Sequence, residues 1–207
     1  MDPQIYWIVV TGTARAGQTT FVDTASETSA YRDRRDMDLI PSDDYDAARA
    51  ATEQWTAHNL ATGETGDVFL LEQVDRFQNS LFVGELTVSD DVFICLYEAP
   101  PSARFDGSWE ALADGLLGIV AIVDATAPET FREATAVVDT LHDSGVPFII
   151  AANKQDLPGA VAPADLAVLL RTDVPVLPCV ALDLNSIKGV LLNLLLLLRV
   201  DARQDNT

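Results

Sequence analysis

The sequence contains few cysteines and few basic residues, and each scarcity excludes a class of protein. The two cysteines, Cys95 and Cys179, both lie in apolar, strand-like runs. That setting predicts buried thiols in a reducing compartment rather than a disulfide framework or a metal site. Only 13 residues are Lys or Arg, against 32 that are Asp or Glu, and the formal net charge is −19. Because nucleic acids and anionic membranes are bound through neutralising cations, we expect neither as a partner.

Long apolar runs are also missing. The richest one, residues 190–200, falls well short of the ~20 residues that a membrane-spanning helix needs. Residues 1–4, MDPQ, lack the basic segment that opens a secretory signal peptide. We therefore expect a soluble, cytoplasmic protein with no membrane insertion.

The composition is nevertheless sufficient for a packed core, since 48% of the 207 residues are hydrophobic. This length predicts a single domain. An acidic insertion or switch-like region is expected at about residues 30–67, where aspartates are frequent and a proline interrupts the chain. Its first part, residues 31–46, is expected to be a loop.

The rest of the chain alternates between apolar runs and helical segments. Apolar strands without polar alternation, separated by helices, predict a mostly parallel sheet covered by helices on both faces, a three-layer α/β fold. Two strands separated by a short polar turn, 81–88 and 92–97, predict one antiparallel hairpin. The other strands are expected at 5–10, 117–123, 146–152 and 174–181, and the helices at 19–29, 46–60, 108–113, 128–143, 163–171 and, with Asp183 as N-cap, 184–199.

A glycine-bracketed loop follows the first strand. Residues 12–19, GTARAGQT, match the phosphate-binding frame G-x-x-x-x-G-K-[ST], except that Gln18 stands in place of the lysine. In this frame backbone N–H groups surround a phosphate, the lysine reaches the β- and γ-phosphates, and the hydroxyl, here of Thr19, binds Mg²⁺. A charge at about 4 Å, at an effective dielectric near 20, is worth roughly 4 kcal/mol. The residues expected to contact the phosphates are Gly12, Arg15, Ala16, Gly17, Gln18, Thr19 and Thr20.

Arg15 lies inside this loop and is the residue that could replace the missing charge, or contact a γ-phosphate from the same chain. The alternative is that the loop is only a turn between a strand and a helix. A second motif bears on this choice. Directly after the apolar run 146–152 stands NKQD, residues 153–156.

This motif resembles the N-K-x-D guanine-recognition motif of Ras-like GTPases. The segments VDATAPETFREA, VPFIIAANKQDLP and VPVLPCVALD are similar to the bacterial MglA-like and Arf-like branch of these proteins. The resemblance implies a Ras-like P-loop NTPase fold, GTP or GDP as ligand, Mg²⁺ at Thr19, and a roadblock-type protein partner. It also implies that Asp156 reads guanine, that Asn153 and Lys154 shape the base pocket, and that the loop at Ala181 and Leu182 supports the base.

The chain departs from the family where the γ-phosphate would lie. The D-x-x-G loop, T-P-G-Q in many bacterial members, is represented by residues 98–102, EAPPS. Pro101 replaces the glycine whose N–H contacts the γ-phosphate, and proline has no N–H. Ser102 replaces the glutamine that orients the attacking water. Glu98 either holds magnesium through water or is an ordinary carboxylate. Ser102 and Arg15 remain as the candidates for a catalytic group.

Three hypotheses follow from this pattern. The first is a degenerate GTPase, a signalling or polarity module that binds guanine nucleotide weakly and hydrolyses it poorly or not at all. The second is an active GTPase that hydrolyses GTP with help from a partner protein. The third is a nucleotide-free scaffold that docks partners through the acidic region at 30–67.

Overall fold

The computed structural model describes residues 4–26, 28–33, 39–41, 80–89, 91–99 and 115–204. By contacts between residues the chain divides into two compact units, residues 1–28 with 84–207, and residues 29–83. In the second unit, β2 (Thr28–Asp33) pairs antiparallel with β3 (Leu39–Pro41). This pairing contradicts the predicted loop at residues 31–33 and 39–41, where backbone hydrogen bonds form a strand pair despite the charged composition. The rest of the predicted loop, residues 34–38 and 42–46, lies outside the described residues.

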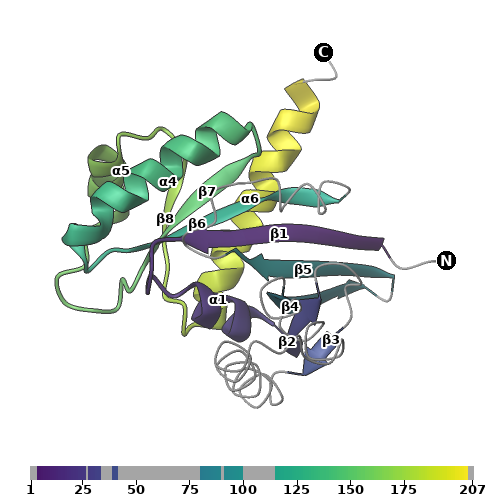
Figure 1. Ribbon diagram of the computed structural model, residues 1–207. Coiled ribbons are helices and arrows are strands. Elements are labelled where there is room, and N and C mark those ends of the chain that lie inside the picture. Colours follow the sequence, from purple (N-terminus) through teal and green to yellow (C-terminus); the bar gives the residue numbers. More distant parts are fainter. Residues whose placement is uncertain are drawn as a thin grey trace, which may run out of the picture. The chain divides into compact units, whose positions relative to one another are not determined.

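The first unit is built on a sheet with strand order β4-β5-β1-β6-β7-β8 (Figure 1). Strands β5, β1, β6, β7 and β8 run parallel, and β4 and β5 form the predicted hairpin. The central strands are buried over most of their length because their sequences are apolar without alternation. Their bounds are Gln4–Gly12 (β1), Ser80–Ser89 (β4), Val92–Glu98 (β5), Leu116–Asp124 (β6), Phe148–Asn153 (β7) and Val176–Pro178 (β8).

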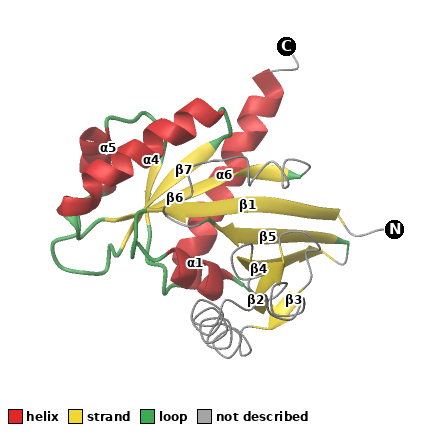
Figure 2. Ribbon diagram, viewed as in Figure 1, coloured by secondary structure: helices red, strands yellow, loops and turns green. Residues whose placement is uncertain are grey.

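Helices cover both faces of this sheet, as the sequence predicts (Figure 2). Helix α1 packs against α6, and α4 packs against α5. Helix α6 begins at the predicted N-cap, where the Asp183 carboxylate accepts the N–H of Asn185 at 2.9 Å. The helix bounds are Gln18–Ala25 (α1), Pro128–Thr130 (the 3-10 helix η2), Phe131–Ser144 (α4), Pro163–Leu170 (α5) and Leu184–Gln204 (α6).

Several element ends differ from the predictions. Helix α1 ends at Ala25, and Ser26 has an extended backbone. Ser26 ends the helix as its C-cap, and serine disfavours the helix interior because its side chain competes for backbone hydrogen bonds. Strand β8 is shorter than predicted and ends at Pro178. The helices predicted at 46–60 and 108–113 lie outside the described residues. Among the helices that the structure describes, none has both the length and the apolar character needed to cross a membrane.

Candidate functional site

The loop between β1 and α1 has a backbone that requires glycine at both ends. Gly12 has a φ of 152°, and a Cβ atom there would lie 2.1 Å from the carbonyl oxygen of Ile122. Gly17 has a φ of 105°, and its Cβ would lie 2.5 Å from the side-chain nitrogen of Asn153. A side chain therefore fits at neither position, because the β6 backbone and the Asn153 amide occupy the space.

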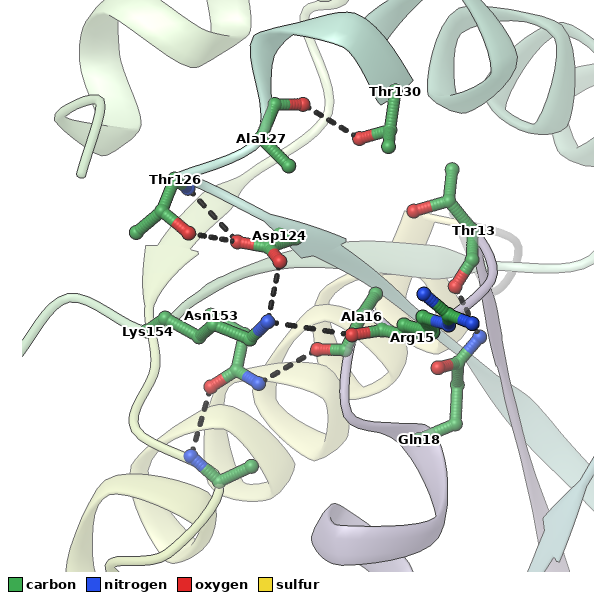
Figure 3. A network of polar contacts seen from close by, with 11 residues as sticks. Thr13, Arg15, Ala16, Gln18, Asp124, Thr126, Ala127, Thr130, Asn153 and Lys154 are labelled. Atoms are coloured by element: carbon green, nitrogen blue, oxygen red, sulfur yellow. Dashed lines mark hydrogen bonds and ion pairs between the residues drawn. The ribbon is translucent and has the colours of Figure 1, made fainter. Parts of the chain in front are cut away.

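Gln18, which replaces the expected lysine, folds back into the loop. Its side chain is only 4% exposed, and Nε2 donates a hydrogen bond to the carbonyl oxygen of Thr13 at 2.8 Å (Figure 3). The same carbonyl accepts the N–H of Ala16 at 3.1 Å. The Gln18 amide therefore closes the loop on itself, while Arg15 and Thr19 stay exposed.

Thr19 lies beside a carboxylate from another strand. Its Oγ1 donates a hydrogen bond to Oε1 of Glu98 at 2.8 Å. The sheet makes this contact possible, since Glu98 ends β5 and pairs with Val10 in the parallel strand β1. Burial raises the pKa of Glu98 above its ordinary value, and the hydrogen bond from Thr19 offsets part of that rise.

A hydroxyl and a carboxylate are both oxygen donors, the type that Mg²⁺ prefers. The residues present at Thr19 and Glu98 therefore fit the predicted ion by donor chemistry. Within the described ranges, however, no group of three or more His, Cys, Asp or Glu side chains is gathered around a common point. Further ligands, as at other Mg²⁺ sites, would come from substrate phosphates and water.

Asn153 joins three loops at the carboxyl ends of the parallel strands. Its Nδ2 donates a hydrogen bond to the carbonyl oxygen of Ala16 at 2.8 Å, and its Oδ1 accepts the N–H of Ala181 at 2.8 Å. The side chain is only 2% exposed. Both ends of the amide are satisfied, so this one residue holds the loop at Ala16 against the loop at Ala181.

Lys154 lies between the end of β6 and the loop that contains Arg15 (Figure 3). Its Nζ forms an ion pair with the carboxylate of Asp124 and donates to the carbonyl oxygen of Arg15 at 3.4 Å. Oδ1 of Asp124 also accepts the N–H and the hydroxyl of Thr126, at 2.9 and 2.6 Å. Burial alone would raise the pKa of Asp124, but the hydrogen bonds from Lys154 and Thr126 outweigh it and lower that pKa.

Asp124 is a site residue that our sequence interpretation missed. It ends the apolar strand β6, and in the sheet it pairs with Asn153 at the end of β7. Asp124 and Asn153 are each the last residue of a buried strand, and both lie at the edge of the sheet where the parallel strands end. That shared position was the available signal, although the sequence alone does not show which strands are neighbours.

A cavity of about 220 Å³ opens beside this network. Asp156 lies at its wall and is exposed, while Leu157 is 46% and Leu182 77% exposed. The cavity brings together the predicted residues of the 153–156 motif, the 181–182 loop and the start of α1. Its lining residues are Gly17, Thr20, Asn153, Lys154, Asp156, Leu157, Val180, Ala181 and Leu182.

The remaining candidates have different outcomes. Ser102 and Pro101 lie outside the described residues, so their proposed roles stay predictions. Cys95 and Cys179 are both buried, as predicted. Burial raises the pKa of the Cys179 thiol to about 11, which leaves it protonated at neutral pH.

Comparison with known proteins supports the fold rather than the chemistry. No family model matches the chain. A solved structure of the FeoB G-domain from Methanococcus jannaschii is similar, with a TM-score of 0.53 and 16% sequence identity, over 95% of this chain and 99% of that one. This likeness, together with the sheet order and the two helix layers, shows that the chain has the three-layer α/β fold of a P-loop G-domain.

Proposed function

We propose that this protein is a degenerate GTPase-like module that binds guanine nucleotide weakly and hydrolyses GTP poorly or not at all. The observation that carries the proposal is the pair of hydrogen bonds made by Asn153, to Ala16 and to Ala181. These bonds join the glycine-bracketed loop to the wall of the cavity that Asp156 lines. A base in the cavity would therefore lie next to a loop able to receive its phosphates.

Guanine suits the cavity for two reasons. The Asp156 carboxylate can accept hydrogen bonds from both the N1–H and the 2-amino group of guanine, and adenine presents neither donor at those positions. The exposed apolar side chains of Leu157 and Leu182 supply surface for the faces of a flat base. Base binding thus draws on groups that are all present in the described part of the chain.

Phosphate binding has weaker support from the residues. Backbone N–H groups and the N-terminus of α1 favour an anion. Gln18, by contrast, is neutral and already bonded to Thr13. When bound, Mg²⁺ would add positive charge at the phosphates, and we propose that Thr19 and Glu98 hold it by exchanging their mutual hydrogen bond for the ion.

A titration with fluorescent GDP, followed by competition with unlabelled GDP and ADP, tests this function. We expect measurable binding and a preference for GDP over ADP. Asp156→Asn should remove that preference, because an amide cannot accept both guanine donors. Asp165→Asn provides the matched control, since Asp165 is an exposed acid on α5 outside the cavity lining. Absence of binding at high micromolar GDP would overturn the proposal and favour the nucleotide-free scaffold.

A second candidate is an active GTPase assisted by a partner, and the Thr19–Glu98 pair favours it because an oxygen site for Mg²⁺ is retained. Positioning and electrostatics dominate phosphoryl-transfer catalysis, so a group supplied in trans can restore a rate. Phosphate release from GTP, measured with Mg²⁺ and with or without a roadblock-domain protein, separates the two. Turnover only in the presence of the partner would favour this candidate. The cytoplasmic location and the partner stay predictions.

A further inference from the structure

We propose that Arg15 supplies the phosphate-binding cation that the loop lacks at position 18. This inference rests on the proposed function, because it concerns the phosphate end of the same site. It names the residue on which affinity for phosphorylated guanine ligands depends. It also predicts that the affinity for GDP depends on Arg15, whereas the affinity for guanosine, which has no phosphate, does not.

The polar side chains around the loop differ in charge and in whether another group already binds them. Gln18 is neutral, and its amide is bonded to the Thr13 carbonyl. Lys154 is charged, but its Nζ is paired with the Asp124 carboxylate. Arg15 is exposed on the loop itself. Among these three described side chains it is therefore the cation that can turn toward a ligand without breaking an ion pair.

Two side chains of the 153–156 motif hold the loop at two consecutive carbonyl groups. The Arg15 carbonyl oxygen accepts from Lys154 Nζ at 3.4 Å, and the next carbonyl, of Ala16, accepts from Asn153 at 2.8 Å. Figure 3 shows the Arg15 side chain leaving the loop on the side away from Lys154, in the direction of Gln18. The backbone is thus fixed by the base end while the guanidinium is free to face the phosphate end.

The backbone of Arg15 has an unusual conformation. Its φ of 64° lies in the left-handed region, which a residue with a side chain adopts rarely and at a cost. Such a conformation persists only where surrounding contacts impose it, and it is concentrated at ligand-binding sites. At Arg15, Lys154 contacts the carbonyl of the same residue and Asn153 contacts the next carbonyl, of Ala16. Glycine would relieve the strain at this position but would remove the charge.

The guanidinium of an arginine is chemically suited to binding phosphate. A guanidinium presents several N–H donors in a planar fork that matches two phosphate oxygens at once. A planar guanidinium suits bidentate phosphate binding better than the point charge of a lysine ammonium does. Because Arg15 is exposed, solvent and salt will reduce its effect relative to a buried lysine. We therefore expect weak and strongly salt-dependent GDP binding.

The experiment measures the affinities for GDP and guanosine by calorimetry in the wild type, Arg15→Gln, Arg15→Lys, Gln18→Lys and the double variant Arg15→Gln/Gln18→Lys. Arg15→Gln should weaken GDP binding about tenfold or more and change guanosine binding less than about twofold. Arg15→Lys should retain part of the affinity for GDP. The double variant should recover the GDP affinity, since the charge has moved to position 18. Rising salt should weaken GDP binding less in Arg15→Gln than in the wild type.

Arg171→Gln is the matched control, because Arg171 is also an exposed arginine with a positive φ, of 54°, and it follows α5 as its C-cap, outside the cavity lining. Its GDP affinity should equal that of the wild type. Unchanged GDP binding in Arg15→Gln, with the preference for guanine retained, would overturn this inference alone. An equal loss of GDP and guanosine binding would also overturn it, since the loop itself would then have changed. A wild type that binds neither ligand would overturn both this inference and the proposed function.

Discussion

The proposed base end of the site, at residues 153–156, and the proposed phosphate end, at residues 12–19, differ in what their polar side chains bond to. At the base end, Asn153 and Lys154 reach across to other loops, and Asp156 is left exposed at the cavity. At the phosphate end, Gln18 bonds to its own loop, and Thr19 bonds to Glu98. The first end holds the loops together and leaves the Asp156 carboxylate exposed, while the second bonds Gln18 and Thr19 to other protein groups and leaves the Arg15 guanidinium exposed.

This difference indicates that the positions of the loops do not depend on a positive charge at position 18. The contacts that position the loops run through Asn153, Lys154 and Asp124, and none of them requires a phosphate. A neutral residue at position 18 is tolerated because the Thr13 carbonyl offers its amide a partner. We therefore expect substitutions at Asn153 and Asp124 to change mainly the stability, and substitution at Gln18 to change mainly the affinity for GDP.

The largest effect is expected for Asn153→Ala. The change leaves the Ala16 carbonyl and the Ala181 N–H without their partner in a buried place, which should lower the free energy of unfolding by about 2–4 kcal/mol. Nucleotide binding should be lost with it. Urea denaturation measures the first effect. Asn193→Ala removes one exposed hydrogen bond, to the Gly189 carbonyl, and should cost less than about 0.5 kcal/mol. A similar cost in both variants would contradict the role given to Asn153.

Asp124→Asn should have the next largest effect, because it leaves Lys154 without its anion. We expect a loss of about 1–3 kcal/mol in the free energy of unfolding at neutral pH. The pKa of Asp124 is lowered, so the stability it contributes is present above the ordinary aspartate pKa and is lost as the pH falls through the lowered value. The gap between wild type and variant, followed by thermal unfolding across pH, should therefore close in acid.

Asp139→Asn, an exposed acid on α4, serves as the control for that series. Its unfolding curve should track the wild type at every pH. If Asp124→Asn were as stable as the wild type at neutral pH, the ion pair with Lys154 would not hold the base end.

Gln18→Lys should strengthen GDP binding rather than weaken the protein's fold. Restoring a charge at the phosphate end should tighten GDP binding about tenfold or more, a difference of about 1.4 kcal/mol. Calorimetric titration gives the affinity directly. The loss of the Gln18–Thr13 hydrogen bond should cost about 1 kcal/mol of stability. Unaltered GDP affinity would mean that residues 12–19 do not cradle phosphates.

The smallest effect is expected for Glu98→Gln. Because the folded-state pKa of Glu98 is raised, the stability that this shift provides is present below the ordinary glutamate pKa and is lost as the pH rises through the raised value. The variant should thus be slightly more stable than the wild type at neutral pH and not in acid. We expect a Tm rise of less than about 4 °C for a chain of this size. A lower Tm at neutral pH would show that the charged form is stabilised by its surroundings.

Much of the fold was predictable because its signals are local. Unbroken apolar runs marked β1, β6 and β7, and the carboxylate of Asp183 marked the start of α6. The roles of Asn153 and Lys154 came from a spaced motif. The pairing of β2 with β3 was not predictable, because β2 is short and contains charged residues and β3 has only three residues, so neither has the long apolar run that marks β1, β6 and β7. The Asp124–Lys154 ion pair likewise depends on which strands are neighbours, and the turn of Gln18 toward Thr13 depends on how the loop closes.

A competition titration with GDP, GTP and ADP in the presence of Mg²⁺ tests the central claim most directly. The comparison of GDP with ADP measures the preference for guanine, and the comparison of GTP with GDP measures the contribution of the γ-phosphate. The account predicts that GDP and GTP bind alike, within about threefold, and that ADP binds at least about tenfold more weakly. GTP bound far more tightly than GDP would reveal a working γ-phosphate site. ADP bound as tightly as GDP would show that the base end does not read guanine, and either result would contradict the account.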